Sequence, residues 1–128
     1  MKLLLDAHTL LWFVWDDAQL TNNAKELITN PANQKFVSAA IYWEIAIKMS
    51  IGKLDLGEPY RPFMRREIAR NNFDILPISV DHAAAVSVLP FHHRDPFDRM
   101  LIAQAMVEQV PIVSGDTAFD AYPITRLW

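Results

Sequence analysis

The sequence has 128 residues, a length that fits one domain, and 52% of them are hydrophobic, which is enough to form a core. It has no cysteine, so disulfide bonds and thiolate metal sites are excluded, and its net charge of −3 does not by itself favour a nucleic-acid partner. No apolar run approaches the roughly 20 residues of a membrane span. We therefore expect one cytoplasmic domain over residues 1–128, with no membrane association.

The chain alternates short apolar runs with segments of helical pattern. The first run, residues 2–5, is apolar on both faces and stops at Asp6, as expected of a buried strand in a parallel sheet. Similar runs predict the remaining strands, the last of them an edge strand, at residues 35–38, 74–78, 111–114 and 124–127.

Helices are predicted between these strands from apolar spacing and from capping residues. Thr21 or Asn22 is expected to cap one helix, Gly52 to follow the end of another, and Asp95 with Pro96 to open the last. Strands that alternate with helices predict a three-layer α/β/α sandwich around a mostly parallel sheet of four to five strands. The predicted helices cover residues 9–15, 24–29, 39–50, 59–71, 80–89 and 96–109.

Four acidic residues are expected at one edge of this sheet. Asp6 ends the first predicted strand and Asp116 follows the fourth, and sites in such sheets form beyond the carboxyl ends of the strands. Glu44 lies in a helix among apolar and aromatic neighbours, where a carboxylate is costly to bury without a charged partner. Asp98 lies in the first turn of the last helix, from which its side chain could face the same edge.

Clustered carboxylates have a chemical use. They repel one another and raise one another's pKa values unless a cation neutralises them. Mg²⁺ prefers oxygen ligands, and two such ions about 4 Å apart can activate water and stabilise the leaving oxygen in phosphodiester cleavage. The acids therefore predict metal-dependent phosphoryl chemistry.

Each acid also has a purely structural interpretation. Asp6 and Asp116 could cap the helical segments that follow them, and Glu44 could occupy the one exposed position of its helix. Asp98 stands in the first turn of its helix, where the helix dipole favours an acid, and Asp95 has the usual place of an N-cap. These interpretations stay open beside the functional one.

Four segments resemble the motifs of PIN-domain nucleases, in the order in which that family has them. Together they span nearly the whole chain, and the most similar type is the VapC-like ribonuclease toxin of bacterial type II toxin–antitoxin modules. The segments are LLLDAHT at residues 3–9, SAAIYWEIAIK at 38–48, HRDPFDRMLIAQA at 93–105 and IVSGDTAF at 112–119.

The resemblance implies a PIN-like fold and cleavage of RNA that depends on Mg²⁺, for which Mn²⁺ can substitute. The catalytic and metal-binding quartet would match Asp6, Glu44, Asp98 and Asp116. Asp95 would be an additional acid that competes with Asp98 for its role. Ser114 stands where the fourth motif often has threonine, and both offer a hydroxyl. The implied polar neighbours of the metal are Thr9, Ser38 and Ser114.

The resemblance also implies partners. The substrate would be RNA, and a small antitoxin protein would insert a basic side chain among the acids; a homodimer is common in the family. Residues 48–70 carry six basic and three acidic side chains, so this segment is either a solvated helix face or a contact for the RNA backbone. The candidate RNA contacts are Lys48, Arg61, Arg65, Arg66 and Arg70.

Single residues argue against other functions. Haloacid-dehalogenase-like phosphatases need a second acid where this chain has His8, and receiver domains need a late lysine, whereas no lysine follows Lys53. His92 and His93 are adjacent in a predicted loop, where neighbouring side chains seldom point the same way, and no third ligand is evident. A free-standing RNA-processing nuclease and a catalytically silent RNA- or protein-binding module stay open. We expect the side chains of Trp12, Trp15 and Trp43 to pack in the core rather than to stack on bases.

Overall fold

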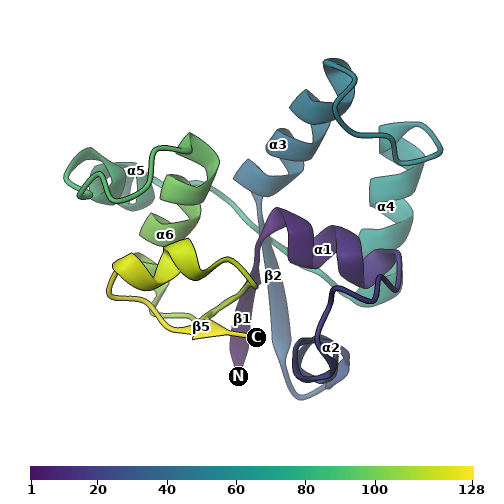
Figure 1. Ribbon diagram of the computed structural model, residues 1–128, viewed down its shortest axis with the longest axis horizontal. Coiled ribbons are helices and arrows are strands. Elements are labelled where there is room, and N and C mark those ends of the chain that lie inside the picture. The colour runs from purple at the N-terminus through teal and green to yellow at the C-terminus, as the bar shows by residue number, and fades with distance from the viewer.

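A computed structural model describes residues 1–128, and its centre is one parallel sheet with the strand order β3-β2-β1-β4-β5 (Figure 1). Every pair of neighbouring strands is parallel. The central strand β1 therefore lies between β2 and β4, as its apolar character on both faces predicts. The strands are β1 (Lys2–Leu5), β2 (Gln34–Ser38), β3 (Asp74–Leu76), β4 (Ile112–Val113) and β5 (Arg126–Leu127).

Helices connect the strands and cover both faces of the sheet (Figure 1). The chain moves from β1 through β2 to the edge strand β3, and then returns to β4 on the other side of β1. Because crossovers between parallel strands are right-handed, the helices before β3 and those after it lie on opposite faces. They are α1 (Ala7–Val14), α2 (Asn22–Thr29), α3 (Ala39–Ser50), α4 (Tyr60–Asn71), α5 (Val80–Ser87), α6 (Pro96–Glu108) and the 3₁₀-helix η1 (Thr117–Ala121).

This arrangement confirms the three-layer α/β/α fold expected from the sequence. None of the helices combines the length and the apolar composition that crossing a membrane requires. The core is centred on β1, whose residues Leu3, Leu4 and Leu5 are completely buried. The strand order reverses at β1, so the carboxyl ends of β1 and β4 border the crevice where sites form in such folds.

Several element boundaries differ from the sequence-based predictions for local reasons. The first helix begins at Ala7 because the Asp6 side chain accepts the Thr9 N–H and caps it. The strand β3 ends before Pro77, which has no N–H to donate to a neighbouring strand. The last strand is an edge strand as expected, but it begins only at Arg126.

The tryptophan side chains do not all lie in the core. Trp12 is half-buried and packs against the core, whereas Trp15 and Trp43 are 42% and 62% exposed, so the core prediction is wrong for these two. The exposed ring of Trp43 on α3 packs edge-on against Phe97 of α6. The sequence could not predict this exposure, because α3 is apolar around most of its circumference and has no distinct polar face.

Candidate active site

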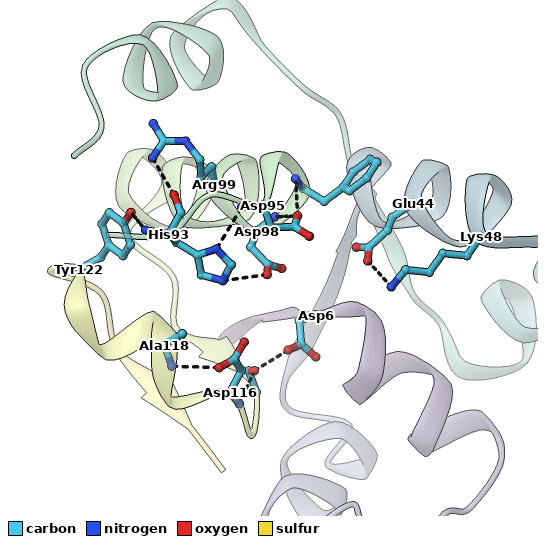
Figure 2. A network of polar contacts seen from close by, with 12 residues as sticks. Asp6, Glu44, Lys48, His93, Asp95, Asp98, Arg99, Asp116, Ala118 and Tyr122 are labelled. Atoms are coloured by element: carbon cyan, nitrogen blue, oxygen red, sulfur yellow. Dashed lines mark hydrogen bonds and ion pairs between the residues drawn. The ribbon is translucent and has the colours of Figure 1, made fainter. Parts of the chain in front are cut away.

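Asp6 occupies the carboxyl end of the central strand, and its two carboxylate oxygens accept hydrogen bonds from two different segments. One carboxylate oxygen, Oδ1, accepts the backbone N–H of Thr9 at 2.8 Å and caps α1. The other, Oδ2, accepts a short hydrogen bond from the Ser114 hydroxyl (Figure 2). The residue is only 6% exposed. Capping and a place in the site are therefore compatible, because a carboxylate has two oxygens that can accept bonds separately.

Asp116 follows β4 and lies beside Asp6. Its Oδ1 accepts the N–H of Ala118 at 2.9 Å and caps η1, and its own backbone N–H donates to the Ser114 hydroxyl oxygen at 3.0 Å. The completely buried Ser114 thus links the two acids through one hydroxyl group. Thr9 supports the same region, because its hydroxyl donates to the Val113 carbonyl at 2.8 Å and ties α1 to β4.

Glu44 is buried on α3 with one oxygen left without a partner. It is 6% exposed, so its interpretation as the exposed position of the helix is wrong. Its Oε2 pairs with Lys48 Nζ at 2.8 Å, one helical turn away, whereas its Oε1 is buried and accepts no hydrogen bond. A buried polar atom without a partner costs about 1–3 kcal/mol, more when charged, and a cation would remove that cost. The residues present therefore fit a hard metal ion.

Asp95 and Asp98 have different positions at the start of α6. Asp95 caps the helix, with its Oδ1 accepting the backbone N–H groups of Phe97 and Asp98 at 2.8 and 3.1 Å. The Asp98 side chain points toward Asp116 and pairs through Oδ2 with Nε2 of His93 at 3.1 Å (Figure 2). Asp98 rather than Asp95 therefore has its carboxylate free of capping bonds.

The electrostatics show that these carboxyl groups share one site. Burial, the largest cause, and the negative charges of four neighbours together raise the pKa of Asp98 to about 7. A carboxyl group with such a pKa is half protonated near neutral pH unless a cation approaches. The contributing neighbours are Asp95, Glu44, Asp6 and Asp116, so the structure brings all the acids of the predicted site together.

His93 is the residue that sequence reasoning missed. Its side chain, Asp98 and Asp116 offer ligand atoms that all lie within 4.8 Å of one another, a grouping that was not evident from the sequence. The expectation that adjacent histidines diverge holds, because His92 packs instead against Tyr122. Its position in the sequence, two residues before the helix cap Asp95, could have indicated that His93 lies near the acids at the start of α6.

The hydrogen bonds of His93 indicate what its ring does. The backbone N–H of Asp95 donates to Nδ1 at 3.2 Å, so the ring proton is on Nε2, from which it donates to Asp98. The backbone of His93 is held as well, by the hydroxyl of Tyr122 at 2.9 Å and by the guanidinium of Arg99 at 3.2 Å (Figure 2). His93 is therefore arranged to orient Asp98 rather than to ligate a metal with Nε2.

The remaining predicted residues are spread more widely. Ser38 is buried and caps α3 through the N–H of Ala40. Lys48 contacts the site by pairing with Glu44, and Arg66 is held by both oxygens of Glu58 at 2.8 and 2.9 Å. Arg61 and Arg65 are exposed on α4. Arg70 lines a cavity at the opposite edge of the sheet, with Gln34 and Asp74 at the amino ends of β2 and β3. The structure thus does not gather the basic residues around the acids.

The raised pKa of Asp98 gives a pH-dependent stability. An acid whose pKa is higher in the folded state contributes stability that is present below its unfolded value and is lost as the pH rises through the folded value, here about 7. For the metal-free protein, we expect the Asp98 contribution to fall between about pH 4 and pH 7. Thermal unfolding with EDTA and with Mg²⁺ measures this: Mg²⁺ should raise Tm more at about pH 7.5 than at about pH 5.5, since the ion needs ionised ligands. An equal rise at both pH values would contradict it.

Comparison with solved structures shows where this fold is shared. VapBC2 from Rickettsia felis, solved bound to a DNA fragment from their promoter, has a TM-score of 0.75 at 15% identity, covering 99% of this chain and 98% of that chain. FitAcB from Neisseria gonorrhoeae has a TM-score of 0.67 at 17% identity, covering 98% and 96%. A toxin–antitoxin complex from Klebsiella pneumoniae has a TM-score of 0.65 at 17% identity, covering 98% and 95%.

The family follows from the sequence match. At identities this low, the solved structures show the fold alone, and no curated protein matches the chain. The family model of the PIN domain, however, matches residues 3–124, which include every acid of the site. The chain therefore belongs to the PIN domain family.

Proposed function

We propose that this protein is a metal-dependent endoribonuclease that hydrolyses RNA phosphodiester bonds. The observation that carries the proposal is the buried Oε1 of Glu44, which has no partner among the carboxyl groups around Asp98. A fold that gathers like charges and leaves one buried oxygen unsatisfied loses stability, as expected of a site built for a cation. The proposed catalytic and metal-binding residues are Asp6, Glu44, Asp98 and Asp116, and the cation is Mg²⁺ or Mn²⁺.

The chain's own residues would hold this site in a defined geometry. When bound, a divalent cation would supply positive charge to the attacking water and to the scissile phosphate. Ser114 holds Asp6 and the backbone of Asp116 in place through one hydroxyl group. Lys48 neutralises one oxygen of Glu44 and leaves the other for the ion.

RNA is the proposed substrate, and a matched pair of oligonucleotides tests it. Cleavage of a single-stranded RNA in Mg²⁺, with the DNA of the same sequence left intact, is the expected result. Cleavage of DNA but not of RNA would contradict the choice of substrate. Metal-dependent tightening of RNA affinity without cleavage of any RNA would instead favour a catalytically silent module.

We further propose that the enzyme acts in the cytoplasm as the toxin of a toxin–antitoxin pair and forms a homodimer. Two observations support the toxin role: the resemblance of the motifs to VapC-like toxins, and the shared fold with a solved toxin–antitoxin complex. Expression should arrest growth, and co-expression with the product of an adjacent short open reading frame should restore it and give a co-purifying complex. Growth that is unaffected by active enzyme would favour a free-standing RNA-processing nuclease.

His93 is expected to act by orienting Asp98. His93→Phe keeps the ring that packs beside Phe119 but removes the donor, and it should lower metal affinity and cleavage about ten-fold or more, as loss of a hydrogen bond to a metal ligand does. His93→Gln offers an amide N–H in a similar place and should retain most of both. Titration of Mn²⁺ binding and single-turnover cleavage measure the two quantities.

The same pair of variants separates the other roles that His93 could have. A lost pH dependence of cleavage in His93→Gln, with normal metal affinity, would show that the ring transfers a proton. Equal loss of metal affinity in both variants would show that the ring is a ligand. Either outcome would contradict the positioning role.

A further inference from the structure

A cleft lined with aromatic side chains opens directly beside the acids. It has a volume of 440 Å³, within the range of small-molecule binding sites. Asp6 and Asp116 lie in its wall, and His8, Trp12 and Trp128 supply the aromatic lining. None of these aromatic residues belongs to the proposed metal-binding set. We propose that this cleft binds one unpaired nucleobase of the RNA, next to the phosphate that is cleaved, an inference that rests on the proposed ribonuclease function.

The aromatic walls come from two segments that are far apart in the sequence. His8 and Trp12 lie one helical turn apart on α1 and stack, with ring centroids 5.3 Å apart and planes 30° apart. Trp128 directly follows β5 and meets Trp12 at 6.0 Å with the planes at 54°. The two indoles thus form a corner rather than a parallel stack, and a corner leaves aromatic surface on which a base can stack.

Gly115 allows the second wall to lie close to the acids. A Cβ atom at this position would be 2.9 Å from Cε2 of the Trp128 indole, closer than real Cβ contacts. Any other residue would therefore push the indole away from the loop that carries Asp116. The register of the sheet fixes the approach from the other side, because Val113 pairs with Leu127, the residue before Trp128.

A nucleobase fits this surface better than other ligands. Unpaired bases stack on aromatic side chains, and such stacking tolerates different bases because each has a flat π-face. Gln19 also lines the cleft and carries an amide that can donate to and accept from a base edge. The phosphate attached to that base would lie toward Asp6 and Asp116, where the proposed cation supplies positive charge.

A second cavity borders the same His8–Trp12 stack. It has a volume of 310 Å³ and shares His8 and Trp12 with the first cleft. Lys48 and Lys53 line it; the ammonium group of Lys48 pairs with Glu44, and that of Lys53 suits a phosphate of a strand that passes over the stack. The two cavities thus adjoin at His8 and Trp12, with the acids lining one and the lysines lining the other.

A scan with abasic ribonucleotides around the mapped cleavage position tests the proposal. In the wild type, removing one base next to the cut should lower kcat/KM about ten-fold or more, as loss of a base–aromatic stack does. Trp128→Ala should show a similar loss on intact RNA and no further loss on the abasic RNA. Trp43→Ala removes an exposed indole that does not line the cleft, so this matched control should keep the abasic penalty.

Several outcomes would overturn the nucleobase cleft. One is a wild type that cleaves RNA but tolerates an abasic residue at every position. Another is a folded Trp128→Ala enzyme that keeps the full abasic penalty. If Trp128→Ala does not fold, Trp128→Leu, which keeps an apolar side chain but no aromatic face, takes its place under the same criterion.

Affinity measurements separate this inference from the nuclease function itself. RNA affinity is measured by fluorescence anisotropy with Ca²⁺ in place of Mg²⁺, on the same abasic series and variants. Base-dependent affinity that requires Trp128, in a protein that cleaves no RNA, would support the cleft and contradict the nuclease. Cleavage without any dependence on the base would do the reverse.

Discussion

Asp6→Asn is expected to lower RNA cleavage by roughly a thousand-fold or more while leaving the fold intact. The change removes one of the negative charges that would hold the cation, and such charge stabilisation contributes several kcal/mol to phosphoryl chemistry. Asparagine keeps an oxygen that can accept the Thr9 N–H, so the cap of α1 survives with a change of about 1 kcal/mol or less. Single-turnover cleavage measures the activity, and the rise in Tm caused by Mn²⁺ measures metal binding. Both the cleavage and the rise in Tm should be lost in Asp6→Asn.

The matched control for this variant is Asp81→Asn. Asp81 is an exposed acid in the first turn of α5, so the substitution changes the same group without touching the site. Cleavage and metal binding should stay at wild-type values. A folded Asp6→Asn enzyme that cleaves RNA like this control would contradict the proposed role of Asp6.

Asp98→Asn is expected to change activity and stability in opposite directions. The site raises the pKa of Asp98 to about 7, so ionised Asp98 destabilises the metal-free fold. The amide removes that repulsion and can still accept the hydrogen bond from His93. Near pH 8, the free energy of unfolding of the metal-free variant should therefore be higher than that of the wild type by on the order of 2 kcal/mol. Cleavage should fall about a hundred-fold or more, because a ligand of the ion is lost.

Thermal and chemical unfolding in EDTA at two pH values check the stability of this variant. The advantage of Asp98→Asn over the wild type should shrink as the pH is lowered from about 8 to about 5, since protonated Asp98 no longer repels its neighbours. A variant that is less stable than the wild type at both pH values would show that Asp98 is a helix-dipole residue rather than a member of a repulsive cluster.

Much of the fold could be predicted because its signals are local in the sequence. The short run at residues 2–5, apolar on both faces, predicted a central buried strand, and β1 is that strand. Asp6 and Asp116 could be placed at one edge because parallel strands end together. Glu44 stood out because its helix offers an acid no polar surroundings, and it is indeed buried.

The contacts between distant segments could not be predicted in the same way. The position of His93 depends on Tyr122, which holds the loop before α6 from a later part of the chain. The separation of Arg70 from the acids depends on α4 running back to the start of β3. Such contacts depend on how the elements pack, and the spacing of residues within one segment carries no record of them.

A helix cap and a place in the candidate site do not exclude each other for the same acid. Asp6 and Asp116 both cap helical segments and both line the site, because capping uses only one carboxylate oxygen. Asp95 uses its carboxylate for a helix cap, whereas the Asp98 carboxylate makes no capping bond and pairs with His93 instead. Which acid caps a helix therefore depends on the direction of individual carboxylate oxygens, which the sequence does not give.

If four carboxylates hold a cation that RNA cleavage requires, cleavage must depend both on the cation and on each carboxylate. Cleavage of a single-stranded RNA is followed in Mg²⁺, after removal of the metal with EDTA, and after Mg²⁺ is restored. Cleavage should stop in EDTA and return with Mg²⁺ in the wild type, and should be absent throughout in Asp6→Asn. Cleavage that continues in EDTA, or that Asp6→Asn retains, would contradict the proposed metal-dependent mechanism.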